Sequence, residues 1–413
     1  MTFKRAHTQD GRLRNLVCMI AYTKYTYDGR VRLEAESLVR WGYKVSFVVP
    51  KEGPKARTYE LNGVEVKEVN VVEYGGKSKI RYCVCYIMFL LRAFIACTEL
   101  SISKRVDTVH VHNMPNLLVL SAIVPRLLGR RLVLDVHDTV IETYEAKFGH
   151  SSWLVLSLLR CEEWICCRIA HTVICVNHVQ REVLIERHIP RAKIITVITM
   201  PRFMVTSTAE GGRSTAPGFR MVNHGTMSRR LGNDLIIRAA ARLADEIPGF
   251  ELHMIGAGDD LPEMISLSKS LGISERVQFH APVPWNDLAQ KLEMMDVGIV
   301  ANRVSAATEL MLPSKLIDYV VLGIPAIVPR LKAIQHYFSE DMVSYFEPGS
   351  VDSIVEATVK LYKDTAHRKS QALAARQFLT RHGWDTTQNE LRQLYPSLCA
   401  SALSEARPCV PVC

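Results

Sequence analysis

The sequence predicts an α/β fold with two doubly wound domains, each built on a parallel sheet. Short apolar runs alternate with amphipathic runs, and in the second half each apolar run ends in Gly, Asn or Pro. The chain has 413 residues, of which 48% are hydrophobic, so it can bury two cores of ordinary size. Residues 206–218 are rich in Gly, Ser and Thr and poor in large apolar side chains, and they predict a hinge linker.

The N-terminal domain is predicted at 1–205. A helix is expected at 31–41, ended by Gly42, and a second at 153–169. The expected strands are 15–22, 45–49, 108–112, 131–136, 172–176 and 194–198. No G-x-G-x-x-G sequence follows the first strand, so the pattern is not that of a dinucleotide-binding enzyme.

The C-terminal domain is predicted at 219–375, with strands at 220–224, 251–255 and 326–328. One helix is expected to begin near Asn233 or Asp234. Another is expected to begin at Ser314, whose hydroxyl has N-cap chemistry, and to end at Gly323.

Positive charge is concentrated in the first half. Residues 1–200 hold 29 Lys and Arg against 19 Asp and Glu, whereas residues 201–413 hold 22 against 23. A basic surface attracts nucleic acid, anionic lipid or acidic substrates. Because no nucleic-acid recognition motif is present and aromatic residues do not alternate with the basic ones, we expect no nucleic-acid partner.

An apolar segment with basic flanks lies within Lys77 to Lys104. Its apolar part, 82–91, is shorter than the ~20 residues that span a bilayer, and Arg92 interrupts it. The segment fits a helix lying in the interface of an anionic membrane. A buried helix of the first domain explains it equally well, and one helix can serve both purposes.

The N-terminus shows no secretory signal, because its first apolar run spans only residues 16–22 and no cleavage site follows. We therefore expect a cytoplasmic protein, or one peripheral to the cytoplasmic face of a membrane. Its 11 cysteines show no paired C-x-x-C spacing and are expected to be reduced residues that fill the core.

An anion site is predicted where the strands of the second domain end. Arg229 and Arg230 follow the first strand, and Lys315 lies at the start of the helix that begins at Ser314. Arginine binds phosphate in a bidentate manner, and the N-terminus of a helix attracts anions. Asp318 lies one turn after Lys315 on the same helix face.

Three glycines flank this predicted site. Gly225 follows the first strand, and Gly256 and Gly258 follow the second. We expect their missing side chains to let a ligand approach the backbone closely.

No metal site is predicted. His110 and His112 share one face of a strand, but no third ligand follows at a suitable spacing. No D-x-D triplet occurs either. Glu162 and Glu163 are adjacent on a helix, point in different directions and are expected to form a solvated face.

The order of these motifs resembles family 4 of the retaining glycosyltransferases, which have the GT-B fold. The resemblance runs from about residue 15 to 395. In the second half it rests on HGT, two arginines, GAG, DVGIVAN, PSKLIDY and GIPAIV. In the first half it rests on YDGRVRLEAESLVRWGYKVSFVV, HVHNMP and LDVHDTV. It implies two Rossmann-like domains facing each other across a cleft, with a helix at 376–399 crossing back to the first domain and a loose tail at 400–413.

The resemblance also implies roles for residues of the first half. His137 is expected beside the donor sugar, as a catalytic residue together with Arg230 and Lys315. Gly29 and Arg30 are expected in the loop that faces the acceptor, although a plain turn and a solvated helix start explain them as well. Asp138 would orient His137 or cap the next helix.

In the second half, the resemblance assigns the donor phosphates to Arg230 and the ribose hydroxyls to Asp318. Family members usually have two glutamates eight positions apart. Asp318 takes the second place, but Leu310 stands at the first, and Glu309 is one residue away.

The function implied is transfer of a sugar from a UDP- or GDP-linked donor to a lipid-linked or polysaccharide acceptor, with retention of configuration and without a cofactor or essential metal. Two alternatives stay open. One is a nucleotide-sugar 2-epimerase, for which acid and base carboxylates are not apparent, and the other is a catalytically silent binding or scaffolding member.

Overall fold

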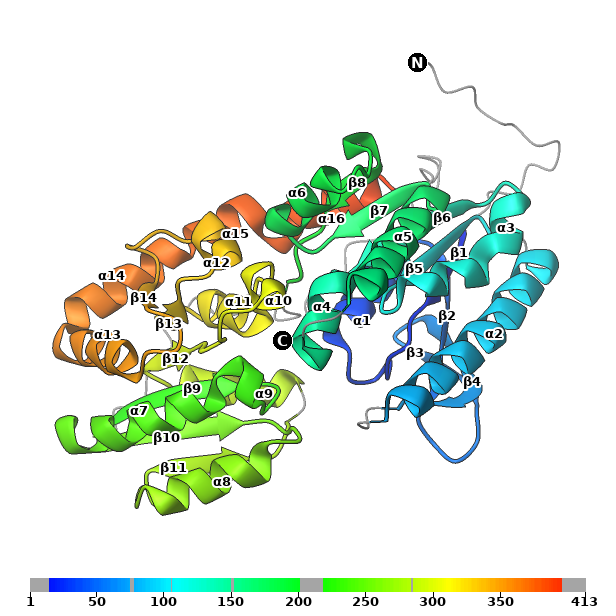
Figure 1. Cartoon of the computed structure of the whole chain (residues 1–413). Helices are drawn as coiled ribbons and strands as arrows, with labels where there is room; N and C mark the ends of the chain where they lie inside the picture. Colours follow the sequence, from blue (N-terminus) through cyan, green and yellow to red (C-terminus); the bar gives the residue numbers. More distant parts are fainter. Residues whose placement is uncertain are drawn as a thin grey trace, which may run out of the picture. The chain divides into compact units, whose positions relative to one another are not determined.

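The computed structural model describes residues 15–74, 78–104, 106–149, 152–200, 218–283 and 285–395. It contains two sheets covered by helices, one formed by strands β1 to β8 and one by β9 to β14 (Figure 1). This arrangement confirms the predicted α/β fold with two parallel-sheet domains.

The first sheet has eight strands. In spatial order they are β3 (Thr58–Leu61), β4 (Val64–Val72), β2 (Lys44–Lys51), β1 (Leu16–Ile20), β5 (Thr108–His112), β6 (Arg131–Val136), β7 (Thr172–Cys175) and β8 (Ile194–Thr196). Strand β1 pairs in parallel with β2 and β5, and β5 pairs in parallel with β6. The predicted strands 108–112 and 131–136 have the bounds of β5 and β6.

The hairpin of β3 and β4 was not predicted. The two strands pair antiparallel across Asn62 and Gly63, whose φ angles are 51° and 79°. An Asn-Gly pair favours a two-residue turn with positive φ at both positions, so the local sequence did carry a signal for it.

Helices connect strands of the first sheet along the chain. They are α1 (Gly29–Arg40), α2 (Lys79–Ser103), the 3-10 helix η1 (Asn116–Ala122), α3 (Ile123–Leu127), α4 (Val140–Phe148), α5 (Trp153–Ile169), α6 (His178–Glu186) and the short η2 (Arg191–Lys193). Asp28 caps α1, because its side chain accepts hydrogen bonds from the backbone N–H groups of Arg30 and Val31.

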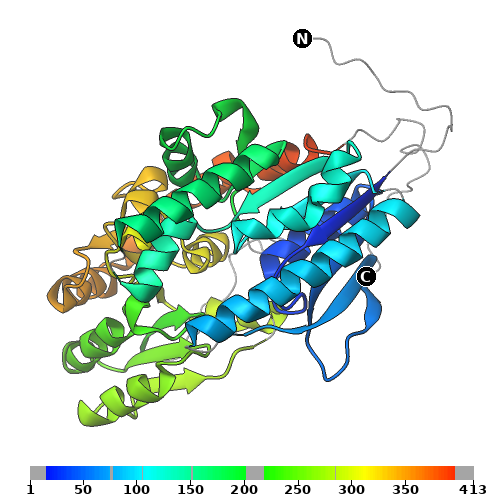
Figure 2. The ribbon, with the colours of Figure 1, turned by 45° about the vertical axis from the view of Figure 1, so that its right-hand side comes forward.

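Helix α2 is much longer than the apolar run that suggested it. Residues Ile80–Ser103 are long and apolar enough to span a membrane by length and composition, which differs from the expectation of a segment too short to do so. One face of α2, including Phe89, Ala93 and Cys97, is fully buried, and the helix contacts β1, β2 and β4 (Figure 2). One face of the helix is therefore part of the core of the first sheet.

Glu162 and Glu163 of α5 do not form the solvated face that was expected. Glu163 is buried. The carboxylate of Glu162 accepts hydrogen bonds from the side chain of Asn116 and the backbone N–H of Leu117, and burial raises its pKa to about 7.

Cys83 and Cys161 are exposed, unlike the buried thiols of Cys166 and Cys167.

The second sheet is parallel in every pair that the structure describes. Its strands, in spatial order, are β11 (Val277–His280), β10 (Phe250–Ile255), β9 (Phe219–His224), β12 (Val297–Ile299), β13 (Ala326–Pro329) and β14 (Ser344–Phe346). Its helices are η3 (Arg229–Leu231), α7 (Asn233–Glu246), α8 (Leu261–Ser270), α9 (Trp285–Glu293), α10 (Ala306–Glu309), α11 (Ser314–Val321), α12 (Lys332–Tyr337), α13 (Val351–Lys363) and α14 (Thr365–Ala375).

The last part of the described chain returns to the strands of the first sheet. Helices α15 (Gln377–His382) and α16 (Trp384–Arg392) are separated at Gly383. Beyond them, the carbonyl of Leu394 accepts a 2.5 Å hydrogen bond from Arg131, and the Tyr395 hydroxyl lies 2.7 Å from Nδ1 of His110.

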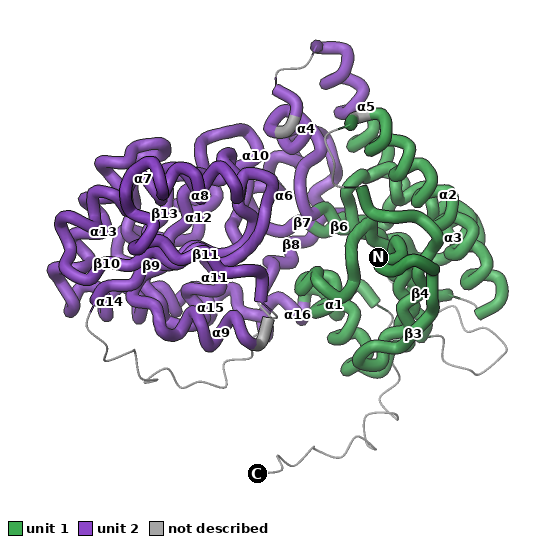
Figure 3. Tube along the Cα trace, turned by 90° about the horizontal axis from the view of Figure 1, so that it is seen from below, with its two compact units in different colours: residues 1–136, 162–174, 390–413 green, residues 137–161, 175–389 purple. Residues whose placement is uncertain are grey.

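The described residues form two compact units (Figure 3). Unit 1 holds residues 15–136, 162–174 and 390–395, and unit 2 holds 137–161 and 175–389. The predicted hinge at 206–218, apart from Gly218, and the predicted tail at 400–413 lie outside the described residues. The predicted domain boundaries and the cleft between domains stay predictions.

Candidate functional site

A buried lysine lies at the end of β9 in unit 2. Lys315, the second residue of α11, is 9% exposed. Its Nζ donates a 2.9 Å hydrogen bond to Oδ1 of Asn223, near the end of β9. A Cβ atom at Gly225 would lie 3.8 Å from Cε of Lys315, so the lysine side chain passes beside this glycine. The structure thus brings together Lys315 and Gly225, which the sequence had assigned to the donor site.

Two asparagines connect this lysine to the loop after β9. The Nδ2 group of Asn223 donates a 2.7 Å hydrogen bond to Oδ1 of Asn233, at the start of α7. Asn233 in turn donates to the carbonyls of Thr226 and Ser228. Sequence reasoning did not assign either asparagine to the site, because an amide that positions a loop has no local pattern.

Asp318 lies beside an imidazole that was also not predicted. His224 Nε2 is 3.3 Å from Asp318 Oδ2, and both side chains are buried. The Tyr319 hydroxyl donates to the carbonyl of Val222, and its ring packs edge-on against His224. Burial and the charge of Lys315 lower the pKa of His224 to about 3, so this imidazole is neutral at physiological pH.

The buried charges of this site are only partly balanced. Burial lowers the pKa of Lys315 to about 8 and raises the pKa of Asp318 to about 8, while the attraction between the two groups opposes both shifts. Oδ1 of Asp318 is buried and accepts no hydrogen bond from the described residues. A ligand with a phosphate near Lys315 and a hydroxyl near Asp318 would satisfy both groups.

Gly256 and Gly258 lie in the loop after β10, which packs closely on the loop after β9. A Cβ on Gly256 would lie 1.9 Å from the carbonyl oxygen of Gly225, and one on Gly258 would lie 2.1 Å from that of Met227. The loops are joined by hydrogen bonds from Gly225 N–H to the Ile255 carbonyl and from Met227 N–H to the Ala257 carbonyl. Close contact between the loops therefore requires Gly256 and Gly258, and the predicted approach of a ligand to them stays a prediction.

The two predicted arginines lie in η3 with exposed side chains. The Arg229 N–H donates to Asp260, and its carbonyl accepts from the guanidinium of Arg303. Arg303 also pairs with Asp234 at 2.6 Å. A shared phosphate for the Arg230 guanidinium and Lys315 stays a prediction.

The structure corrects the N-cap role of Ser314 and gives Glu309 a contact within unit 2. Ser314 is the first residue of α11; the N-cap is Pro313, and no side chain caps the helix. Glu309 accepts a 2.7 Å hydrogen bond from the backbone N–H of Lys332. Its carboxylate therefore accepts from the first N–H group of α12, and its contact with a sugar stays a prediction.

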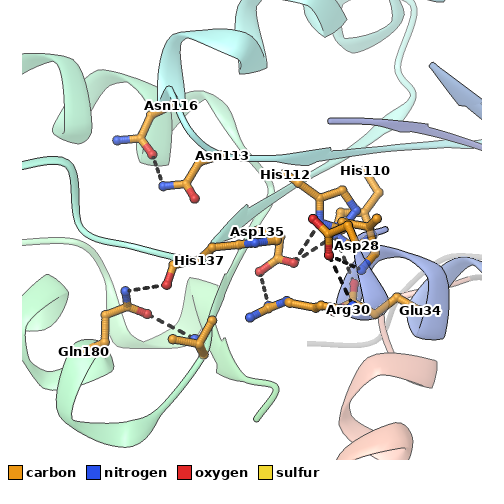
Figure 4. A network of polar contacts seen from close by, with 12 residues as sticks. Asp28, Arg30, Glu34, His110, His112, Asn113, Asn116, Asp135, His137 and Gln180 are labelled. Atoms are coloured by element: carbon orange, nitrogen blue, oxygen red, sulfur yellow. Dashed lines mark hydrogen bonds and ion pairs between the residues drawn. The ribbon is translucent and has the colours of Figure 1, made fainter. Parts of the chain in front are cut away.

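In unit 1, Arg30 is not a solvated helix start, and its place in the acceptor-facing loop stays a prediction. Its guanidinium is buried and lies 2.6 Å from Asp135 Oδ1 and 3.3 Å from Glu34 Oε1 (Figure 4). Burial and the nearby charge of Asp135 raise the pKa of Glu34 to about 8. Gly29 is the exposed first residue of α1, with open space where a Cβ would stand.

His137 and Asp138 follow β6 directly. The carbonyl of His137 accepts a hydrogen bond from Gln180, whose Oε1 accepts from the N–H of Val176. The side chain of His137 is half-buried and Asp138 is exposed. The N-cap residue of helix α4 is Thr139, whose side chain forms no capping hydrogen bond, and Asp138 precedes it.

Two family models match the chain. The model described as "Glycosyl transferase 4-like domain" matches residues 29–198, and the model described as "Glycosyl transferases group 1" matches residues 218–364. The chain belongs to family 4 of the glycosyltransferases. The first model covers the strands of the first sheet from β2 to β8, and the second covers the second sheet of this family 4 chain.

Known proteins agree with this assignment. A D-inositol 3-phosphate glycosyltransferase of Corynebacterium urealyticum is 25% identical over 182 residues, which are 42% of this chain and 42% of that protein. The alignment thus spans less than half of the curated relative. Sucrose-phosphate synthase from Thermosynechococcus elongatus has a TM-score of 0.72 and 15% identity, covering 95% of this chain and 100% of that one.

Another similar structure is Anabaena Alr3699/HepE in complex with UDP-glucose. Its TM-score is 0.66 at 13% identity, and the match covers 94% of this chain and 99% of that one. These structures establish that the family 4 chain has the GT-B fold.

Proposed function

We propose that this chain transfers a sugar from a nucleoside-diphosphate sugar to an acceptor, with retention of configuration. The observation that carries the proposal is the buried Lys315 at the N-terminus of α11, hydrogen-bonded at the end of β9. Open α/β sheets bind ligands at the carboxyl ends of their strands, and a helix N-terminus with a cation suits a phosphate. The similarity to a UDP-glucose complex supports a UDP-linked donor.

In this mechanism, electrostatic stabilisation of the departing diphosphate supplies much of the rate. Lys315 and the free N–H groups at the start of α11 receive the negative charge that develops on the leaving phosphate. Arg229 and Arg230, with exposed side chains after β9, are available to the same group. Asp318 accepts hydrogen bonds from the ribose, and His137 supports the reacting sugar.

Transfer proceeds without an essential metal or enzyme nucleophile in this proposal. The sequence contains no D-x-D triplet, the arrangement that would hold a metal on a diphosphate. The acceptor oxygen attacks the face that the nucleotide leaves, and the leaving phosphate takes the acceptor proton. Domain closure would exclude water and so limit hydrolysis of the donor.

The test is a donor screen followed by an acceptor assay. We expect UDP or GDP to raise the melting temperature of the full chain, because a ligand that binds only the native state stabilises it. With the matching sugar nucleotide, a membrane lipid extract should then release free nucleoside diphosphate. No release with any donor and acceptor would favour a silent binding protein, and epimerised donor without release would favour an epimerase.

We further propose that the acceptor is lipid-linked and that α2 lies on an anionic membrane at the cytoplasmic face. The outer face of α2 carries large exposed apolar side chains at helical spacing, which form a stripe. These residues are Ile80, Val84, Ile87, Met88, Leu91, Ile95 and Ile102. A stripe of this size is unusual on a surface that faces only water.

Charge favours an anionic membrane as the surface that covers this stripe. Basic residues are exposed beside the apolar residues: Arg81 and Arg92 of α2, and its C-cap residue Lys104. Leu127 of α3, a helix that contacts α2, is 80% exposed and extends the apolar surface. Lys77 lies outside the described residues. An amphipathic helix with basic residues binds anionic interfaces by this combination of forces.

Replacing Leu91 by Asp should weaken binding of the full chain to vesicles that contain phosphatidylglycerol by about 10-fold, because it removes one apolar side chain and adds a repelled charge. Co-sedimentation measures the effect. Leu373→Asp is the matched control, since Leu373 is an exposed leucine of α14 in unit 2. Equal binding of both variants, or no preference of the wild type for anionic over neutral vesicles, would contradict the proposal.

A further inference from the structure

Four potential metal ligands converge in the interior of unit 1, apart from the proposed donor site. Glu34 comes from α1, His110 and His112 from β5, and Asp135 from β6 (Figure 4). One ligand atom from each residue lies within 4.8 Å of every other, and all four residues are buried. From the sequence, no metal site was predicted at the two histidines, because no third ligand follows them at a suitable spacing. The fold supplies a third and a fourth ligand from elements that are distant in sequence.

Distances between the ligand atoms suit a small cation. His110 Nε2 lies 3.8 Å from Glu34 Oε2 and 3.9 Å from Asp135 Oδ2, and His112 Nδ1 lies 3.0 Å from the same Asp135 oxygen. Tetrahedral zinc, with bonds of about 2.0–2.2 Å, separates its ligand atoms by roughly 3.3–3.5 Å. The 3.0 Å pair is a hydrogen bond in this structure, whose proton a cation would replace. The longer separations, of up to 4.8 Å, would have to shorten around the cation.

The carboxylates are held with one oxygen turned inward. Arg30 binds the outer oxygens, Oδ1 of Asp135 and Oε1 of Glu34. The inner oxygen of Glu34, Oε2, is buried and forms no hydrogen bond with the described residues. A buried carboxylate oxygen without a donor is costly unless a proton or a cation reaches it.

The histidine on the other side of the cluster also has an outer partner. Nδ1 of His110 lies 2.7 Å from the hydroxyl of Tyr395. Metal-binding histidines commonly donate their second ring N–H to such a group, which fixes the ring and the tautomer. His110 is thus positioned to offer Nε2 to the centre of the cluster.

The ionisable groups around the cluster have an excess of negative charge. Three carboxylates lie close to Arg30: Glu34 and Asp135 contact its guanidinium, and Asp28 accepts from its backbone N–H. With neutral imidazoles the fully ionised set carries about two negative charges, which a divalent cation would cancel. Protons could cancel the same charge, on either the carboxylates or the imidazoles, so the experiments must separate a cation from protons.

We propose that Glu34, His110, His112 and Asp135 bind one divalent cation with the ligand preferences of zinc. Two imidazole nitrogens and two carboxylate oxygens are a ligand set that zinc accepts in tetrahedral geometry. The site is closed by protein, so its role is structural. The cation ties α1 to β5 and β6, and it leaves the metal-independent transfer reaction unaltered.

The first test is the metal content of the full chain, refolded from denaturant with either zinc or a chelator and then freed of unbound metal. We expect about one zinc per chain in the first sample and a lower melting temperature in the second. Refolding with cobalt should produce the absorption bands of a tetrahedral complex. A folded chain that retains no zinc or cobalt, with the same melting temperature under both conditions, overturns the proposal.

The variant Glu34→Gln separates a cation from a proton. Glutamine resembles a protonated glutamate, so a cluster balanced by protons should keep its melting temperature. Under the proposal, Glu34→Gln loses most of the zinc. Its melting temperature is then the same after refolding with zinc and after refolding with chelator. Glu68→Gln is the control, because Glu68 is a buried carboxylate paired with Arg57 outside the cluster. Full zinc content in Glu34→Gln overturns the proposal.

Discussion

Lys315→Ala is expected to weaken UDP binding by about 10- to 100-fold and to lower turnover by about 10²–10³-fold. The wild-type ammonium is buried at the end of β9 with Asn223 as its hydrogen-bond partner. Alanine would remove the charge that faces the diphosphate and leave Asn223 Oδ1 without its donor. Isothermal titration with UDP measures the binding, and release of nucleoside diphosphate measures the turnover.

The pH dependence of UDP binding gives a second measure of the same lysine. Burial lowers the pKa of Lys315 to about 8, so the free protein loses this positive charge as pH rises through that value. Wild-type affinity should therefore fall between pH 7 and 9, with proton uptake on binding, whereas Lys315→Ala should lose that part of the dependence. Lys363→Ala, at an exposed helix position of unit 2, is the control. Wild-type affinity in Lys315→Ala would exclude the phosphate role.

Gly256→Ala is expected to lower the free energy of unfolding by about 3–5 kcal/mol and to abolish UDP binding. The new Cβ would stand 1.9 Å from the Gly225 carbonyl oxygen, in a residue with φ of 148°. Relief of this contact requires the loop after β10 to separate from the loop after β9. The Gly225 loop passes beside Lys315, so the donor site would change with it.

Urea denaturation measures the loss, and Gly349→Ala serves as the comparison. Gly349 also has a positive φ, of 84°, but has open space where its Cβ would stand. That variant should lose only the ~1–2 kcal/mol that a left-handed backbone costs an ordinary residue. Equal losses in the two variants would show that backbone strain, and not contact between the loops, explains Gly256.

Local pattern was sufficient for much of the fold. Strands β5 and β6 and helix α5 have the bounds predicted from apolar runs and their flanking residues, because side-chain periodicity follows from backbone geometry alone. The position of Lys315 near the start of a helix was predicted for the same reason. Asn62 and Gly63 show that an available turn signal can be overlooked.

Burial and pairing between distant segments could not be predicted. Arg30 and Glu162 have ordinary surface sequences around them, yet tertiary contacts bury Arg30 against Asp135 and place Glu162 on Asn116. The prediction for Glu309 depended on its separation from Asp318 along the chain. In the structure, its carboxylate accepts a hydrogen bond from the backbone N–H of Lys332. A local pattern does not record which segment will cover a residue.

The amino-acid sequence by itself determined the alternation of strands and helices, the two-domain α/β class and the family, because these depend on periodicity and on the order of short motifs. Only the tertiary structure decided that Asn223, His224 and Asn233 join Lys315, and that Glu34 and Asp135 meet the histidines of β5. The physical reason is that hydrogen bonds, desolvation and ion pairing depend on distances in space, which the folded sheet sets between residues far apart in the chain.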